Sequence, residues 1–140
     1  MTTLKISDLS VGDWVQDNYG NYVKVMGIWQ GCNFNYQVDV RRDGMIGTIV
    51  PCNIHPIPIT AEILEKNGFE RGQRGNFYHY LRLDKNRTLY IHASTNGWRV
   101  EITYDAAGIL RTTHLMPDVV SIHQLQHALR LAGVDKEINL

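Results

Sequence analysis

The sequence predicts an α+β protein: a small SH3-like β-barrel, then an antiparallel β-sheet packed by a short helix and a C-terminal helix. Three observations predict this class. Short alternating segments with glycine and asparagine turns fill about the first 50 residues, three prolines then interrupt the chain, and longer alternating segments precede an amphipathic helix. We expect two domains, the barrel over residues 1–58 and the sheet-and-helix region over residues 59–140.

The first part is predicted to be built from hairpins. Gly12-Asp13 opens a strand, and residues 18–21 (Asn-Tyr-Gly-Asn) turn the chain into a second one. Residues 36–40 alternate as a third strand, residues 42–44 (Arg-Asp-Gly) form a turn, and residues 45–50 form a fourth strand. Such spacing leaves room only for hairpin connections, as in a small SH3-like barrel.

A proline-rich segment and a short helix follow the barrel. Prolines 51, 56 and 58 oppose regular structure, so we place the domain boundary there. Thr60 is a candidate N-cap for a helix over residues 61–67, and Gly68 is its expected stop. We expect a loop over residues 70–76.

The last part is predicted to be a sheet covered by a helix. Strands are expected over residues 77–83, 88–93, 98–104 and 108–115, and the proline of Pro117-Asp118 precedes the helical segment VVSIHQLQHALRLAG. Alternation places one set of apolar side chains on a common face: Leu81, Leu83, Leu89, Ile91, Val100 and Ile102. The helix should cover that face with Ile122, Leu125, Leu129 and Ala132, and should end at Gly133.

Composition limits the classes of function. The formal net charge is zero, which gives no overall attraction for extended nucleic acid or an anionic membrane. Cys32 and Cys52 have no metal-type spacing, and no segment resembles a leader or a membrane span, so we expect a protein of the bacterial cytoplasm. Between Glu70 and Arg99, six basic residues against two acidic ones leave a modest local excess of positive charge.

Candidate chemistry is sparse. His123 and His127 have the helical spacing of two metal ligands, but the intervening HQLQH sequence lacks the glutamate of the metalloprotease motif, so we expect a polar helix face there. The sequence contains no GxSxG, phosphate-loop or HExxH motif. We therefore expect no catalytic residues, no metal and no cofactor.

The strongest candidate site is the outer face of the second sheet. If the leucines face the helix, strand alternation turns a set of aromatic and basic residues the other way: Tyr78, Tyr80, Arg82, Tyr90 and His92, joined by Arg99 and Arg111. Arg71 and Arg74 from the neighbouring loop are candidates for anion contact. Tyrosine and arginine stack on planar rings and bind phosphates. The alternative is that the aromatics are simply good strand formers, or that the barrel buries this face.

Three motifs also carry a resemblance. At DLSVGDWV, IHPIPITAEILEKNGFE and VSIHQLQHALRLAG, the chain resembles a group of small proteins from Bacteroidota genomes and their phages. That group has a barrel-like N-terminal segment, a Pro-Ile-Pro linker and a C-terminal His-Gln-Leu-Gln helix, and no known activity. The resemblance implies a phage or mobile-element context and transfers no site residues.

These observations lead to three functional hypotheses. The first is a non-enzymatic phage or prophage accessory protein, oligomeric, which binds a host protein or a nucleotide-type signalling ligand and so acts against host defence. The second is a hydrolase or nuclease that acts on nucleotides through dispersed histidines such as His92, His114 and His123. The third is a structural or assembly component in which the barrel is an interaction module.

Overall fold

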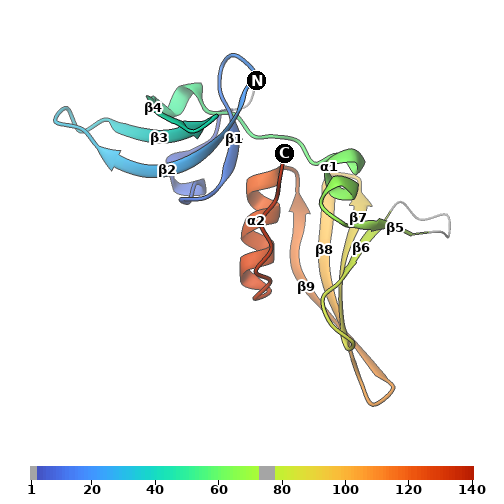
Figure 1. Cartoon of the computed structure of the whole chain (residues 1–140). Coiled ribbons are helices and arrows are strands. Elements are labelled where there is room, and N and C mark those ends of the chain that lie inside the picture. The colour runs from blue at the N-terminus through green and yellow to red at the C-terminus, as the bar shows by residue number, and fades with distance from the viewer. Residues whose placement is uncertain (1–2, 73–77) are drawn as a thin grey trace. The chain divides into compact units, whose positions relative to one another are not determined.

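The computed structural model describes residues 3–72 and 78–140, and it divides into two compact units. One unit comprises residues 1–58 together with Ser121–His123, and the other comprises Ile59–Val120 and Gln124–Leu140. The class is α+β, because two antiparallel sheets and two α-helices make up the described chain (Figure 1). None of the helices in the described part of the chain is long and apolar enough to cross a membrane.

The first unit is an antiparallel meander with strand order β1-β2-β3-β4. Its elements are the 3₁₀ helix η1 (Ile6–Asp8), β1 (Trp14–Gln16), β2 (Tyr22–Gln30), β3 (Tyr36–Arg42), β4 (Met45–Ile49) and the 3₁₀ helix η2 (Pro51–Asn53). The predicted strands and turns are therefore present. At the β3–β4 turn, Asp43 and Gly44 have φ angles of 50° and 81°, the two positive values that a type I′ hairpin turn needs.

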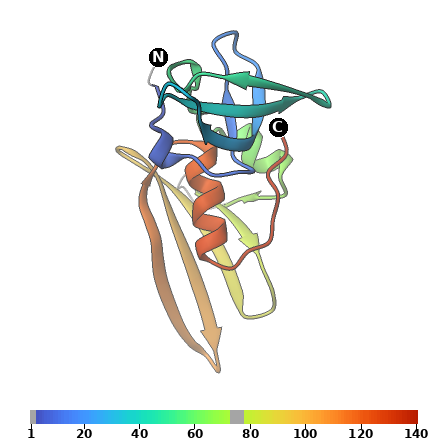
Figure 2. The same ribbon diagram turned by 90° about the vertical axis from the view of Figure 1, so that its left-hand side faces the viewer.

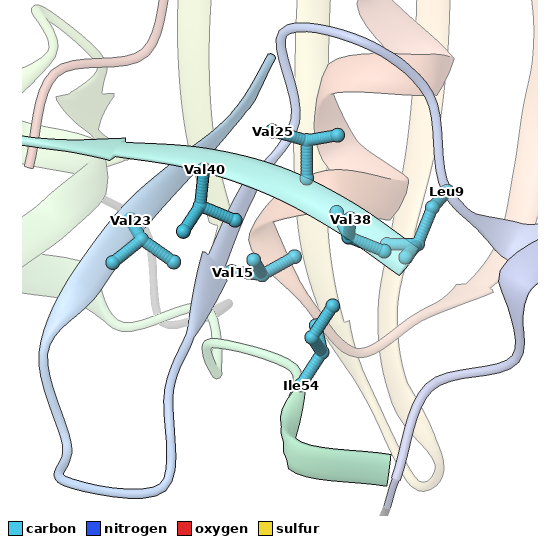
Figure 3. Close-up of a cluster of buried hydrophobic side chains, with 7 residues drawn as sticks. All are labelled: Leu9, Val15, Val23, Val25, Val38, Val40 and Ile54. Atoms are coloured by element: carbon cyan, nitrogen blue, oxygen red, sulfur yellow. The ribbon is translucent and has the colours of Figure 1, made fainter. Parts of the chain in front are cut away.

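Branched aliphatic side chains from all parts of this unit meet in one core (Figure 3). The buried members are Leu9, Val15, Val23, Val25, Val38, Val40 and Ile54. The valines lie on one face of β1 to β3, as strand alternation requires. Leu9 comes from the chain before β1 and Ile54 from the chain after β4.

The predicted closed barrel is not found in the described part of this unit. After η2 the chain returns to the β1 edge, where the backbones of Gln16 and His55 exchange hydrogen bonds of 2.9 and 2.8 Å. This bridge covers the β1 edge. The β4 edge pairs only with β3, and the four-stranded sheet stays open there.

The second unit has a five-stranded antiparallel sheet with the order β5-β6-β7-β8-β9. Its strands are β5 (Glu70–Arg71), β6 (Tyr78–Arg82), β7 (Arg87–Ser94), β8 (Gly97–Ala106) and β9 (Ile109–Val119). Two sequence predictions were wrong here. Glu70 and Arg71 form an edge strand and not a loop. β9 continues through Pro117, at an irregularity in its pairing with β8, where an edge strand tolerates a residue without an N–H.

Helix α1 (Ala61–Lys66) begins where predicted and ends one residue earlier than predicted, with Asn67 as its C-cap. Thr60 Oγ1 accepts a hydrogen bond of 3.2 Å from the Ile63 N–H and caps the first turn. Gly68, with φ of 83°, follows the last turn, and the bonds from Gly68 N to Glu65 O and from Phe69 N to Leu64 O form a Schellman motif. Only glycine adopts this φ without strain, which explains why the helix stops there.

Helix α2 (Ile122–Leu131) lies against one face of the second sheet (Figure 2). Leu125 and Leu129 of the helix are buried, as are Leu89 and Ile91 of β7, so the predicted helix-covered face is confirmed. The predicted polar helix face is wrong for His123, which is buried, with Nδ1 2.8 Å from Ser121 Oγ. That hydroxyl partner allows the polar ring to be buried.

The residues after α2 return towards α1. Ile138 is buried, and Asn139 exchanges two hydrogen bonds of 2.8 Å with the side chain of Asn67. The side-chain amide of Asn67 also donates to Ile63 O at 2.8 Å. One buried amide therefore holds both the end of α1 and the end of the described chain.

Candidate functional site

The candidate site is the face of the second sheet turned away from α2, which we call the outer face. Register fixes its members, because Tyr78 pairs with His92, Tyr80 with Tyr90, and His92 in turn with Arg99. Directly paired residues project to the same side of a sheet. The outer face therefore consists of Glu70, Tyr78, Tyr80, Arg82, Thr88, Tyr90, His92, Ser94, Arg99, Glu101, Thr103, Asp105, Leu110, Thr112 and His114.

Four aromatic rings form a continuous cluster on this face. Tyr90 lies at its centre, with ring centroids 6.0 Å from Tyr78, 6.2 Å from Tyr80 and 5.8 Å from His92. The rings of Tyr90 and His92 are stacked, with an interplanar angle of 20°. All four side chains are half-buried, so each is packed by its neighbours and still open to a ligand.

Gly72 brings backbone directly under this cluster. Its N–H donates to Tyr78 O at 2.9 Å, and a Cβ at this position would overlap the Tyr78 ring. The absence of a side chain at Gly72 therefore allows the ring to occupy its place in the cluster.

A carboxylate lies beside the aromatic cluster. Glu101 Oε1 is 2.9 Å from His114 Nδ1 and 3.7 Å from Arg99 Nη1, and its Oε2 is 3.4 Å from His92 Nε2. The Glu101 side chain is only 13% exposed. Three nitrogen-bearing side chains thus surround one nearly buried acid, which compensates the cost of removing its charge from water.

A second carboxylate holds the edge of the cluster. The Tyr80 hydroxyl donates to Glu70 Oε2 at 2.7 Å, and this hydrogen bond raises the pKa of Tyr80 above its ordinary value, since the neutral phenol is the donor. Tyr80 therefore stays neutral and fixed in orientation.

The candidate residues named from the sequence do not all lie on this face. Tyr78, Tyr80, Arg82, Tyr90, His92 and Arg99 do. Arg71 pairs with His79 and projects to the opposite face, and Arg111 is also on the opposite side because it pairs with Tyr104. Arg74 lies outside the described residues. Sequence reasoning missed Glu101, although its spacing of two residues from Arg99 would have placed it on the same face.

Arg71 instead belongs to an ionic group beside α1. Its Nη2 is 2.9 Å from Glu65 Oε1, and the same oxygen is 3.2 Å from Nε2 of the buried His79. The hydrogen bond from His79, aided by the charge of Arg71, lowers the pKa of Glu65 below its ordinary value. This arginine already has a carboxylate partner and supports the fold.

The predicted basic patch is largely neutralised. Arg71 pairs with Glu65, Arg87 Nε lies 2.7 Å from Asp84 Oδ2, and Arg99 faces Glu101. The outer face itself carries two arginines, Arg82 and Arg99, against the three carboxylates Glu70, Glu101 and Asp105. With neutral histidines two positive and three negative charges leave a formal charge of −1, which does not favour a polyanion.

The described residues contain no group of three or more His, Cys, Asp or Glu side chains arranged to hold a metal ion. Of the three histidines considered for catalysis, His92 and His114 share Glu101, whereas His123 is buried beside Ser121. Comparison with protein-family models, curated proteins and solved structures gave no match, so function has to be inferred from these residues.

Proposed function

We propose that this chain is a binding protein and that its outer face captures a nucleotide-type ligand by stacking the planar base on the cluster of Tyr78, Tyr90 and His92. The observation that supports this most directly is the half-exposed aromatic cluster, continuous across β6 and β7. Stacking of a base on an aromatic side chain contributes about 1–3 kcal/mol. Rings already held by their neighbours lose little conformational freedom when a ligand binds.

Charge narrows the class of ligand. Arg82 and Arg99 are exposed and can each contact a phosphate oxygen, but the three carboxylates on the same face would repel a run of phosphates. A ligand with one phosphate per base, such as a nucleoside monophosphate or a cyclic dinucleotide, fits this balance better than a triphosphate or a nucleic acid strand.

The proposal also includes a biological role in phage or prophage. The resemblance to phage proteins and the nucleotide-type ligand together support an accessory protein that sequesters a host signalling nucleotide in the bacterial cytoplasm. We further propose that the first unit is an SH3-like barrel, supported by the path from β4 through η2 back to the β1 edge. Such a unit would contact a host protein.

Binding can be tested by titrating AMP, GMP and a cyclic dinucleotide into the protein by isothermal calorimetry. Replacing the central ring, Tyr90→Ala, should weaken binding by about 5- to 150-fold, the equivalent of one lost stacking contact. The pair Tyr80→Ala with Arg82→Ala, which removes the edge of the cluster and a phosphate contact together, should abolish binding and leave the fold intact. Tyr104→Ala is the matched control, because Tyr104 is on β8 but projects to the opposite side. Equal affinity for Tyr90→Ala and the wild type, or no binding of any nucleotide, would reject the proposal.

A second candidate function is nucleotide hydrolysis. The observation that favours it is the shared contact of His92 and His114 with Glu101, because an acid that orients a histidine is a recurring catalytic arrangement. Recovery of the nucleotide after the protein is denatured separates the two functions. Intact nucleotide supports capture, and a converted product that disappears in Glu101→Gln supports hydrolysis.

A further inference from the structure

The β4 edge of the first unit has an open, uncharged backbone. β4 is the last strand of its sheet, and its sequence MIGTI contains no charged residue and no proline. Met45, Ile46, Gly47 and Thr48 are all exposed. Proteins usually protect such an edge with lysine, proline, a bulge or a covering segment.

The other sheet edges in the described chain are protected. His55 bridges to β1, β5 is only two residues long, and β9 contains the exposed, charged Arg111 as well as Pro117. The contrast with β4 indicates that this edge is kept open for a partner strand.

The hairpin geometry determines which groups face that partner. Arg42 and Met45 flank the two-residue turn, so they form a hydrogen-bonded pair, and this type of pair recurs at every second residue. Met45, Gly47 and Ile49 therefore direct their N–H and C=O groups towards β3. Ile46 and Thr48 direct theirs to the open edge.

Gly47 gives independent support for a partner at this edge. Its φ is not in the left-handed region, and a Cβ built on it would have no heavy atom within 4 Å. Neither backbone conformation nor packing within the chain therefore requires glycine. Glycine inside a strand often marks a place where another backbone approaches closely.

We propose that β4 pairs antiparallel with β4 of a second copy of this chain, about a two-fold axis through Gly47. Ile46 then lies opposite Thr48 of the other copy, and the two equivalent pairs exchange four backbone hydrogen bonds. Gly47 meets its own symmetry mate at the closely spaced position, where Cα atoms are about 4.5 Å apart. The arrangement is self-complementary and places no like charges opposite each other.

The contact is small. A five-residue strand with the exposed side chains of Met45 and Ile46, together with the neighbouring Val50, gives a contact at the lower end of specific interface sizes, below about 1,200 Å². We therefore expect a dimer that dissociates in the micromolar range. It does not depend on the outer face, so the Tyr80 and Arg82 double variant should dimerise normally.

Sedimentation velocity tests the pairing at protein concentrations from about 1 to 500 µM, a range that covers micromolar dissociation constants. The wild type should shift from the 16.0 kDa monomer towards twice that mass as concentration rises. Ile46→Lys should remain monomeric at all concentrations, because a charged lysine protects a strand edge and the two introduced lysines would lie diagonally across the two-fold axis and repel each other. Ile109→Lys is the matched control and should dimerise as the wild type does, since Ile109 is 60% exposed against 64% for Ile46.

Amide hydrogen exchange supplies a readout that does not depend on a variant. The amides of Ile46 and Thr48 should exchange more slowly at high protein concentration, while that of Gly47 should change little. A wild type that stays monomeric at 500 µM, an Ile46→Lys variant that dimerises, or loss of the dimer in Ile109→Lys would each overturn the proposal.

Discussion

The buried amide of Asn67 allows a stability prediction with a magnitude. Asn67 is 5% exposed and makes three hydrogen bonds of 2.8 Å, two with the backbone of Asn139 and one with Ile63 O. Each such bond contributes about 0.5–1.5 kcal/mol net. Asn139 is exposed, so water can replace part of what it loses. We expect Asn67→Ala to lower the free energy of unfolding by about 2–3 kcal/mol.

Urea unfolding followed by circular dichroism measures this change. Asn86→Ala is the control: Asn86 is an exposed turn residue, and its substitution should change the free energy of unfolding by less than about 0.5 kcal/mol. A chain ending at Glu137 completes a double-mutant cycle. Without Asn139, the Asn67→Ala substitution should cost at least about 1 kcal/mol less than in the full chain. Equal costs in both chains would refute the assigned role of the Asn67–Asn139 contact.

Two further outcomes are expected. Gly72→Ala should displace the Tyr78 ring, because a Cβ at this position would overlap it, and should weaken nucleotide binding as a truncated ring would. Since Tyr78 packs against three neighbouring rings, a small loss of stability in urea should accompany this change, whereas wild-type affinity would contradict the role of Gly72. The lowered pKa of Glu65 means that its ionised form is stabilised by folding, so this contribution is present above the pKa of the unfolded chain and is lost as the pH falls through the folded value. Glu65→Gln should therefore reduce the loss of stability between pH 7 and pH 3, measured by thermal melts. If the loss is as large as in the wild type, the contact with His79 is excluded as its cause.

Local signals in the sequence were sufficient for most elements of the fold. Asp43-Gly44 marks a two-residue turn, Thr60 and Gly68 define both ends of α1, and alternation separates Leu89 from Tyr90, because each of these features depends only on residues close in the chain.

The candidate-site residues that the sequence placed on the wrong face are those whose position depends on strand register. Arg71 projects away from Tyr80 because β5 pairs Glu70 with that tyrosine. A two-residue strand is too short to show a pattern from which this register could be predicted. Arg111 also projects to the other face, because the two-residue turn at Ala107-Gly108 sets it opposite Tyr104. Unlike the register of β5, this turn is a local signal from which the sequence could have given the correct face. A shift of one residue moves a side chain to the other face, so candidate-site residues at strand ends were the hardest to assign.

The residues of the outer face could be there because they favour strands or because they bind a ligand, and Glu101 distinguishes these two explanations. Strand preference accounts for tyrosines on β6 and β7, and cross-strand aromatic pairs stabilise a sheet by about 0.2–1 kcal/mol each without any ligand. It does not account for an acid held at 13% exposure, since a threonine there would fit a strand better and would avoid desolvating a charge. Glu101 instead contacts the side chains of two histidines and an arginine at the border of the aromatic cluster. That arrangement fixes polar groups beside a stacking surface, which a ligand-binding face requires and a sheet alone does not.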